Sequence, residues 1–280
     1  MLIYQLPNEA WHDDAVPLLP THILADEWVL YHGTSNLCEN DIETTGFQSR
    51  QDSLISLEVV QRVLACFSRL NWYGNDQGGY VVLKSYTALH DYSYKSGKPI
   101  FLGESCRRSL LYATRDFAGG EGCRGLRKAL HDLHTYLADE DVRVGALTQC
   151  IDNIINEYGE VVYEDMVPLA VEELTWLQDE LTVLQPVREY VDSLYEQYRY
   201  GIVYAIKFNK KDIANLFYAN GMGITHVGTI SRDKIVAKLL TDGSSTAYNS
   251  YIGDRQRFMN MQTWHGRVPH ASAARIIQIL

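Results

Sequence analysis

The sequence predicts an α+β fold in which a mixed β-sheet core is split by an acidic all-helical insertion. Short β-branched and aromatic segments, typical of strands, occur before residue 124 and after residue 198. Between these limits, apolar residues recur at the three- and four-residue spacing of amphipathic helices. Residues 132–198 also carry 2 basic and 16 acidic groups, a net charge of −14 in a chain whose total is −10. We therefore expect core halves at 1–123 and 199–280 and an insertion at 124–198.

Strand and helix signals alternate along both halves of the predicted core. The expected strands are Glu27–His32, Gly79–Ser85, Pro99–Leu102, Gly201–Phe208 and Ile224–Ile230. A capping serine followed by apolar positions predicts helices that begin at Ser56 and at Ser105, the second running to Phe117, and a short helix over Ser231–Leu239. Ile42–Phe47 resembles a short helix that ends at a glycine.

The insertion has the most regular apolar pattern in the chain. Leucines recur at 4-3-4 spacing over Leu126–Leu137, and a second seam runs from Ala170 to Leu184. Pro186 ends that helix, because proline lacks an amide hydrogen and clashes with the preceding turn. We expect three or four packed helices. Their acidic groups form either a solvated face or an element that binds a partner or shields the basic C-terminal third from polyanions.

Composition restricts the class of protein. A hydrophobic content of 46%, with 11% aromatic residues, excludes a wholly disordered chain. No apolar run reaches the roughly 18 to 20 residues of a membrane helix. Residues 1–11 contain no basic stretch followed by an apolar core, so we expect no signal peptide. The five cysteines lack C-x-x-C spacing and are expected to be reduced thiols in a cytoplasmic protein.

The first segment suited to a ligand site lies at the end of a predicted strand. There the sequence places His32, Gly33 and Thr34 in succession. Glycine lets a ligand approach the main chain closely, so that its N–H and C=O can bind a planar amide. Histidine and threonine add directional hydrogen-bonding groups on either side. On these residues alone, a histidine satisfied at a strand end is the favoured interpretation.

The second segment combines a short strand with the helix that follows it. Phe101 lies in the strand, and Ser109 and Tyr112 lie in the helix after a glycine turn. The two aromatic rings could line a slot for a flat ligand ring. Ordinary core packing would use the same residue types, so this segment alone does not predict a site.

Together, the two segments resemble the ADP-ribosyltransferase superfamily of the poly(ADP-ribose) polymerase and diphtheria-toxin type. That family opens with a strand ending in His-Gly-Thr, as His32–Thr34 does, followed by an I-x-x-x-G-[FL] segment, as in Ile42–Phe47. Its second motif is a strand tyrosine, then a helical Ser or Ala and a Tyr. Aligning on Ser109 and Tyr112 places Phe101 at the strand tyrosine. A last strand and short helix are similar to 227–235, so the resemblance covers 27–118 and 200–240.

The resemblance implies an enzyme that consumes NAD⁺. Gly33 would bind the nicotinamide carboxamide through its main chain, His32 would bind the adenosine ribose, and Thr34 would support the ribose or the main chain. Phe101 would stack on the nicotinamide, as the family's tyrosine does. Ser109 and Tyr112 would complete the NAD⁺ site. The reaction would cleave the nicotinamide–ribose bond through an oxocarbenium-like centre and transfer ADP-ribose to a nucleophile, without a metal.

One departure from the family pattern affects catalysis. The family usually places a glutamate at the start of the last strand, where it contacts the nicotinamide ribose and helps to position or deprotonate the acceptor. Here that position falls at 223–225, which contains no acid. His226 has a suitable pKa for a base, although strand alternation puts it on the face of Ile224 and not on that of Thr225. Otherwise Glu104 or Glu121 supplies the carboxylate, or the protein is a non-catalytic relative.

Three further features carry weaker predictions. The glycine-rich segment 118–125 is expected to be a mobile loop at the mouth of a site. His131 and His134, with Cys123, suggest a metal site, but further ligands are not evident and we expect none. Basic residues in 107–128 and in the C-terminal third are interleaved with aromatic residues near the end of the chain, which suits pyrophosphate or nucleic-acid binding. A solvated surface and a tail packed on the core are the alternatives.

The sequence therefore predicts an NAD⁺-dependent ADP-ribosyltransferase, a glycosyltransferase that is an intracellular toxin or a defence effector. The basic C-terminal third favours RNA or DNA as the acceptor over a protein. By analogy with stand-alone relatives, we expect a neutralising protein partner of the antitoxin kind. The alternatives are a transferase that modifies protein, an RNA 2′-phosphotransferase of the same fold, and a catalytically inactive NAD-binding or interaction module.

Overall fold

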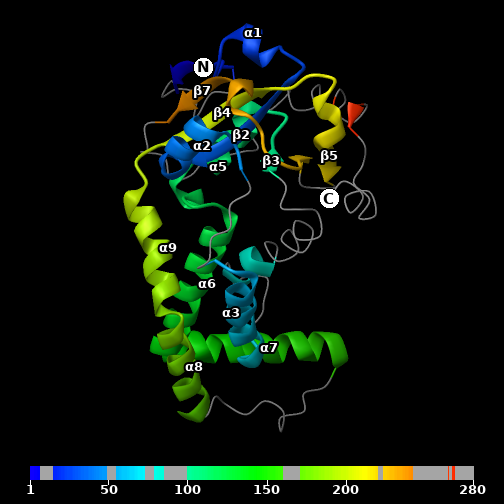
Figure 1. The fold of residues 1–280 in the computed structure, drawn as a ribbon. Coiled ribbons are helices and arrows are strands. Elements are labelled where there is room, and N and C mark those ends of the chain that lie inside the picture. The colour runs from blue at the N-terminus through cyan, green and yellow to red at the C-terminus, as the bar shows by residue number, and fades with distance from the viewer. Residues whose placement is uncertain are drawn as a thin grey trace. The chain divides into compact units, whose positions relative to one another are not determined.

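A computed structural model describes most of the 280-residue chain. The described residues are 1–6, 15–48, 55–72, 79–84, 100–159, 171–219, 223–241, 264 and 267–268. Two compact units can be distinguished in it (Figure 1). The first comprises 1–51, 90–120 and 194–280, and the second comprises 52–89 and 121–193. The second unit therefore takes in a stretch, 52–89, that the sequence assigns to the N-terminal half of the core.

A four-stranded mixed sheet forms the centre of the first unit. Its strands are β1 (Leu2–Gln5), β2 (Val29–Ser35), β4 (Gly201–Lys207) and β7 (Ile235–Leu240). They lie in the order β1-β7-β4-β2, with β1 parallel to β7 and the other neighbours antiparallel. The predicted α+β class is thus confirmed. The chain brings β2 and β4 together across the helical segments, as the split core requires.

Helix α5 (Cys106–Tyr112) packs on one face of this sheet, and Ser105 caps it by accepting a hydrogen bond from the Arg108 amide. Two glycines allow the close approach. A Cβ on Gly33 would lie 1.9 Å from the Ser109 main-chain oxygen, and one on Gly201 would lie 1.7 Å from that of Ala113. Both positions, on neighbouring strands, therefore exclude a side chain. Short α1 (Thr21–Leu24) contributes Ile23 to the apolar cluster on the same face.

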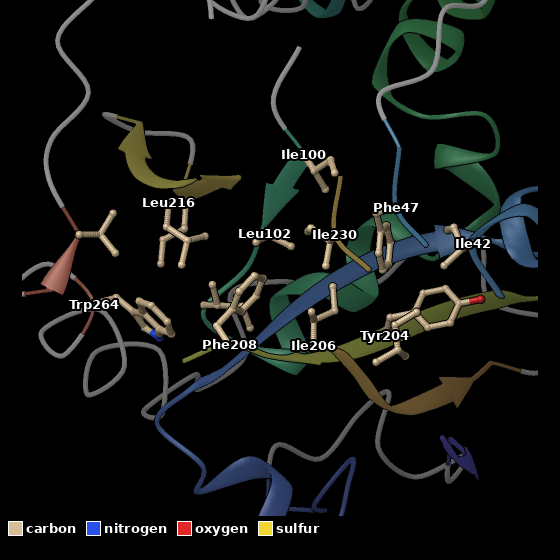
Figure 2. Close-up of a cluster of buried hydrophobic side chains, with 14 of the residues drawn as sticks. Ile42, Phe47, Ile100, Leu102, Tyr204, Ile206, Phe208, Leu216, Ile230 and Trp264 are labelled. Atoms are coloured by element: carbon tan, nitrogen blue, oxygen red, sulfur yellow. The ribbon is translucent and has the colours of Figure 1, made fainter. Parts of the chain in front are cut away.

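A second, three-stranded antiparallel sheet has the order β3-β6-β5. Its strands are β3 (Ile100–Leu102), β6 (Gly223–His226) and β5 (Leu216–Ala219). Side chains from both sheets form one buried cluster, which Figure 2 shows with Phe208 and Trp264 among its members. Trp264 is 1% exposed, so this one aromatic residue of the C-terminal segment packs on the core.

Helix α2 (Glu39–Thr45) ends at Gly46, whose φ is 82°, as the sequence predicts. A charged cluster beneath it holds the helix to the sheet. The ammonium group of Lys238 on β7 pairs with Glu39 at 2.6 Å and also with Glu43, while the Tyr200 hydroxyl donates to Glu39 at 2.6 Å. The burial of Lys238 opposes its charge, but the two carboxylates outweigh this and raise its pKa.

The second unit is helical. Its helices are α3 (Leu57–Arg69), α6 (Glu121–Ala138), α7 (Glu140–Tyr158), α8 (Val171–Val183) and the first part of α9 (Gln185–Gln197), with residues 79–84 also helical. Three leucines of the predicted stripe, Leu126, Leu130 and Leu133, are buried in α6, which contacts α3, α7 and α8, and Leu137 is half-buried. Arg62 and Arg69 of α3 form bidentate ion pairs with Glu180 and Glu173 of α8. Pro186 lies in the first turn of α9, where its missing amide costs nothing.

Three local predictions are wrong. Residues 79–84 are helical, because Gly79 packs against Ala129 of α6 and its amide donates to Asp132 at 2.9 Å, so tertiary packing overrides β-propensity. The predicted Ser231–Leu239 helix is a 3₁₀ turn, η6 (Arg232–Lys234), followed by β7. A four-residue apolar spacing fits a helix and a strand equally. In the predicted glycine-rich loop, α6 already begins at Glu121.

Candidate functional site

The predicted histidine, glycine and threonine lie in the second half of β2. β2 is an edge strand of the four-stranded sheet and pairs there with β4. Alternation puts Gly33 on the face covered by α5, together with Tyr31. His32 and Thr34 lie on the opposite face. The side chains of His32 and Thr34 therefore point away from α5, whereas a side chain at Gly33 would point toward it.

The main-chain groups of β2 alternate between its two edges. The amide of Phe208 donates to the Trp28 carbonyl, and the amide of Asn36 donates to that of Tyr200, so even-numbered residues face β4. Tyr31 faces the other way and exchanges two hydrogen bonds with Gly103, at 2.9 and 2.7 Å. Gly33 is two residues further on, so its N–H and C=O also point to the edge away from β4.

At that edge β2 and β3 begin a ladder and then separate. The antiparallel register that pairs Tyr31 with Gly103 would next pair Gly33 with Phe101. Within the described part of the chain, no bridge joins these two residues. The Phe101 carbonyl instead lies 2.8 Å from Nδ1 of His32. The separation leaves the N–H and C=O of Gly33 without a partner among the described residues.

Ser109 and Tyr112 of α5 lie beside this open edge. The Cβ position of Gly33 is 1.9 Å from the Ser109 oxygen and 3.0 Å from the Tyr112 Cβ, and that of Gly103 is 2.5 Å from the Ser109 hydroxyl oxygen. The Tyr112 ring is partly exposed and meets Phe117 edge-on, with 5.1 Å between ring centroids. The structure thus brings together Gly33, Ser109 and Tyr112, and the Phe101 carbonyl contacts His32, the residue before Gly33.

His32 is held by two contacts. Since a carbonyl only accepts hydrogen bonds, Nδ1 must carry the hydrogen that is donated to Phe101. The Phe47 ring meets the imidazole edge-on at 4.9 Å (Phe47 is labelled in Figure 2). Burial lowers the pKa of His32, and the hydrogen bond to Phe101 only partly opposes this. The ring is therefore neutral near pH 7, with Nε2 as an acceptor.

His226, the other predicted catalytic histidine, is not brought to this group. It lies opposite Ile100 on β3 and Leu216 on β5, both members of the apolar cluster of Figure 2, and is 3% exposed. Nδ1 of His226 lies 3.2 Å from the Gly228 carbonyl in the adjacent turn. Burial lowers its pKa. Phe101 lies opposite Thr225, so on β6 the residue that shares its face is a threonine.

The missing carboxylate is therefore not supplied by β6. Thr225 is buried, and its hydroxyl donates to the Phe217 carbonyl at 3.2 Å. Glu104, one of the predicted substitutes, follows Gly103 directly and is 2% exposed. Glu121, the other, begins α6 in the second unit. Glu104 is thus the substitute that the chain places next to the open edge.

The weaker predictions are only partly covered by the structure. Arg107 is buried and donates to the Val16 carbonyl, and Arg267 pairs with Glu27, so these members of the suggested basic rim have structural partners. The tail aromatics other than Trp264 lie outside the described residues. Cys123 is buried in α6, and in the described part of the chain no cluster of three or more His, Cys, Asp or Glu side chains could hold a metal ion.

Gly103 and Gly201 matter to this site, but the sequence did not single them out. Each carries a signal, since Gly103 ends a predicted strand and Gly201 begins one. Gly103 meets Ser109 within the same stretch of chain, whereas the closeness of Gly201 to Ala113 joins distant segments, which no local pattern contains. Comparisons with protein-family models, with curated proteins and with solved structures found no match to this chain. Among the described helices, none is both long and apolar enough to cross a membrane.

Proposed function

We propose that the chain binds NAD⁺ at the open edge of β2 and transfers its ADP-ribose to a nucleophile. The observation that carries the proposal is that the N–H and C=O of Gly33, beside Ser109 and Tyr112, have no partner among the described residues. A primary carboxamide offers both a donor and an acceptor in one plane, so it can exchange two hydrogen bonds with one extended residue. Among common cofactors, nicotinamide presents such a group on a flat ring.

The aromatic residues near this edge suit the flat ring. Phe101 and Tyr112 come from β3 and α5, and both are partly exposed. A phenylalanine stacks on a pyridinium ring without needing a hydroxyl, so the departure from the family's tyrosine preserves this contact. The Ser109 hydroxyl lies beside Gly103 and can add a hydrogen bond to the carboxamide.

The chemistry follows from the leaving group. When the bond between ribose C1′ and the pyridinium nitrogen breaks, its electron pair stays on nicotinamide, which becomes neutral. The ribose carbon acquires oxocarbenium character and then forms a bond to an oxygen or nitrogen of the acceptor, which loses a proton. Holding the carboxamide fixes the leaving group for this step. RNA or DNA is the favoured acceptor, because residues 199–280 carry 11 basic and 4 acidic groups.

A second candidate function is NAD⁺ binding without turnover. It is favoured by the absence of a carboxylate on β6 beside Phe101, where the described residues are Thr225 and Gly223. In that case the open edge would serve recognition alone. Release of nicotinamide distinguishes the two, since a binding module retains the intact dinucleotide.

The test is to incubate the full chain with adenine-labelled NAD⁺ and, separately, total RNA, single-stranded DNA and protein. We expect free nicotinamide and label on a nucleic acid. Phe101→Ala should reduce nicotinamide release about tenfold or more, because stacking a flat base contributes about 1–3 kcal/mol. Phe101→Tyr should retain the activity, and Tyr218→Ala on β5 serves as the control. Binding of NAD⁺ without nicotinamide release would support the second candidate, and no binding would refute both.

A further inference from the structure

We propose that His32 is a positioning residue that holds β2 and β3 apart, so that the main chain of Gly33 stays available to a ligand. The proposal rests on the proposed function only for the identity of the ligand, the nicotinamide carboxamide. Its structural part concerns two strands of the first unit and can be tested without any ligand.

The register of β2 and β3 is set by one main-chain pair. Tyr31 and Gly103 exchange both of their main-chain hydrogen bonds. In a regular antiparallel ladder the next such pair lies two residues along each strand, at Gly33 and Phe101. There the Gly33 amide would donate to the Phe101 carbonyl, and the Phe101 amide would donate to the Gly33 carbonyl. Neither bond is formed, although the strands are already adjacent one pair earlier.

His32 occupies the acceptor that this ladder would use. Its Nδ1 lies 2.8 Å from the Phe101 carbonyl oxygen, an ordinary hydrogen-bond distance. The donor comes from the residue next to Gly33, so the imidazole substitutes for the Gly33 amide at the same carbonyl. A side chain is longer than a main-chain amide, and it therefore keeps the two backbones further apart than a ladder bond would.

The ring is braced in this position. Phe47 meets it edge-on at 4.9 Å, and Phe47 itself exchanges hydrogen bonds with Ile230 at 2.9 and 3.0 Å. Phe47 also meets Tyr204 of β4 at 5.5 Å. Because the ring is confined in this way, His32 can hold a fixed spacing between the strands instead of following them together.

The consequence is a division of labour between neighbouring residues. His32 provides the hydrogen-bond donor for the Phe101 carbonyl, which would otherwise accept a hydrogen bond from the β2 main chain. Gly33 keeps one donor and one acceptor at an edge from which β3 has turned away. A strand edge with free main-chain groups readily accepts a ligand that offers the complementary pair. Removing the imidazole donor should let the ladder extend by one pair and close this edge.

The test is amide hydrogen exchange measured residue by residue on the full, unliganded chain. In the wild type the Gly33 amide should exchange at least about tenfold faster than those of Tyr31 and Gly103, which are hydrogen-bonded. His32→Leu replaces the imidazole donor with an apolar side chain. In this variant the exchange rate of the Gly33 amide should fall toward that of the Tyr31 amide. His32→Asn, which retains an N–H donor, should leave Gly33 fast.

His226→Ala is the matched control, because it removes another histidine of the first unit and should leave Gly33 exchange unchanged. Slow exchange of Gly33 in the wild type, or unchanged exchange in His32→Leu, would overturn the proposal. Where His32→Leu does not fold, slow exchange of Gly33 in the wild type or in His32→Asn would still overturn the proposal. The two proposals can fail separately. If Gly33 exchange is fast and slows in His32→Leu but the chain does not bind NAD⁺, the positioning role of His32 holds and the proposed function is refuted.

Discussion

His32 and His226 have similar local surroundings, but their main-chain contacts join segments at very different distances along the chain. Both rings lie near or within the first unit's apolar core, burial lowers the pKa of both, and in each Nδ1 lies within hydrogen-bond distance of a main-chain carbonyl. His32 reaches a carbonyl 69 residues away on another strand, whereas His226 reaches one 2 residues away in its own turn. The first contact sets the distance between two strands, and the second only closes a turn.

This difference shows why a histidine with a suitable pKa is not a sufficient sign of a catalytic base. His226 was the nearest ionisable residue in sequence to the missing glutamate, but its strand position turns it toward Ile100 and Leu216. His32 lies beside a glycine whose main chain has no partner in the described part of the chain. Position relative to unsatisfied groups, and not ionisation, separates the two histidines.

The largest expected difference between the two neighbourhoods is in stability, when the glycine near each histidine, Gly33 or Gly228, is replaced by alanine. Gly33→Ala would place a Cβ 1.9 Å from the Ser109 oxygen, so α5 must move, and we expect a loss of about 3 kcal/mol or more in the free energy of unfolding. Gly228→Ala has open space around its Cβ and only the strain of a φ of 87°, about 1–2 kcal/mol. Urea denaturation followed by circular dichroism measures both. Equal losses would mean that α5 does not press on Gly33 as described.

A smaller effect is expected from pH. Because burial holds the pKa of both histidines below the ordinary value of 6.5, the folded chain binds fewer protons than the unfolded chain at mildly acidic pH. Stability is then full above about pH 6.5 and falls as the pH drops below it, by up to about 1.4 kcal/mol per pH unit and histidine. We expect His226→Asn to flatten this fall between pH 7 and pH 5.5, as measured by urea denaturation. The pKa values of His32 and His134 are lowered as well, so these two histidines should maintain a residual slope in the variant.

Local chemistry made much of the first unit predictable. The strand predicted at Glu27–His32, the helix ended by Gly46 and the cap at Ser105 were each predicted from a few adjacent residues. The structure confirms them as secondary structure, although the strand runs on to Ser35. β1 was not predicted, since Leu2–Gln5 is a short edge strand whose residues are mostly exposed. The Ser231–Leu239 helix was predicted wrongly because Ile235 and Leu239 fit either period.

The candidate site was predictable only in its parts. Sequence placed Gly33 at a strand end and Phe101 and Tyr112 near one another, because each inference needs one segment. The separation of β2 from β3 depends on the Tyr31–Gly103 bridge and on the His32–Phe101 bond, both between distant segments. A glycine with a free main chain is therefore a property of the fold, and the sequence alone supports it only as an expectation.

The most direct test of the account is to titrate nicotinamide into the ¹⁵N-labelled full chain and follow the amide resonances. We predict that the Gly33 amide shifts with millimolar nicotinamide, together with those of Phe101 and Tyr112, while the His226 amide does not. Nicotinic acid, whose carboxylate lacks the N–H donor for the Gly33 carbonyl, should produce a much smaller change at Gly33. A Gly33 resonance that stays fixed at the highest nicotinamide concentration, or responds equally to nicotinic acid, would contradict the account.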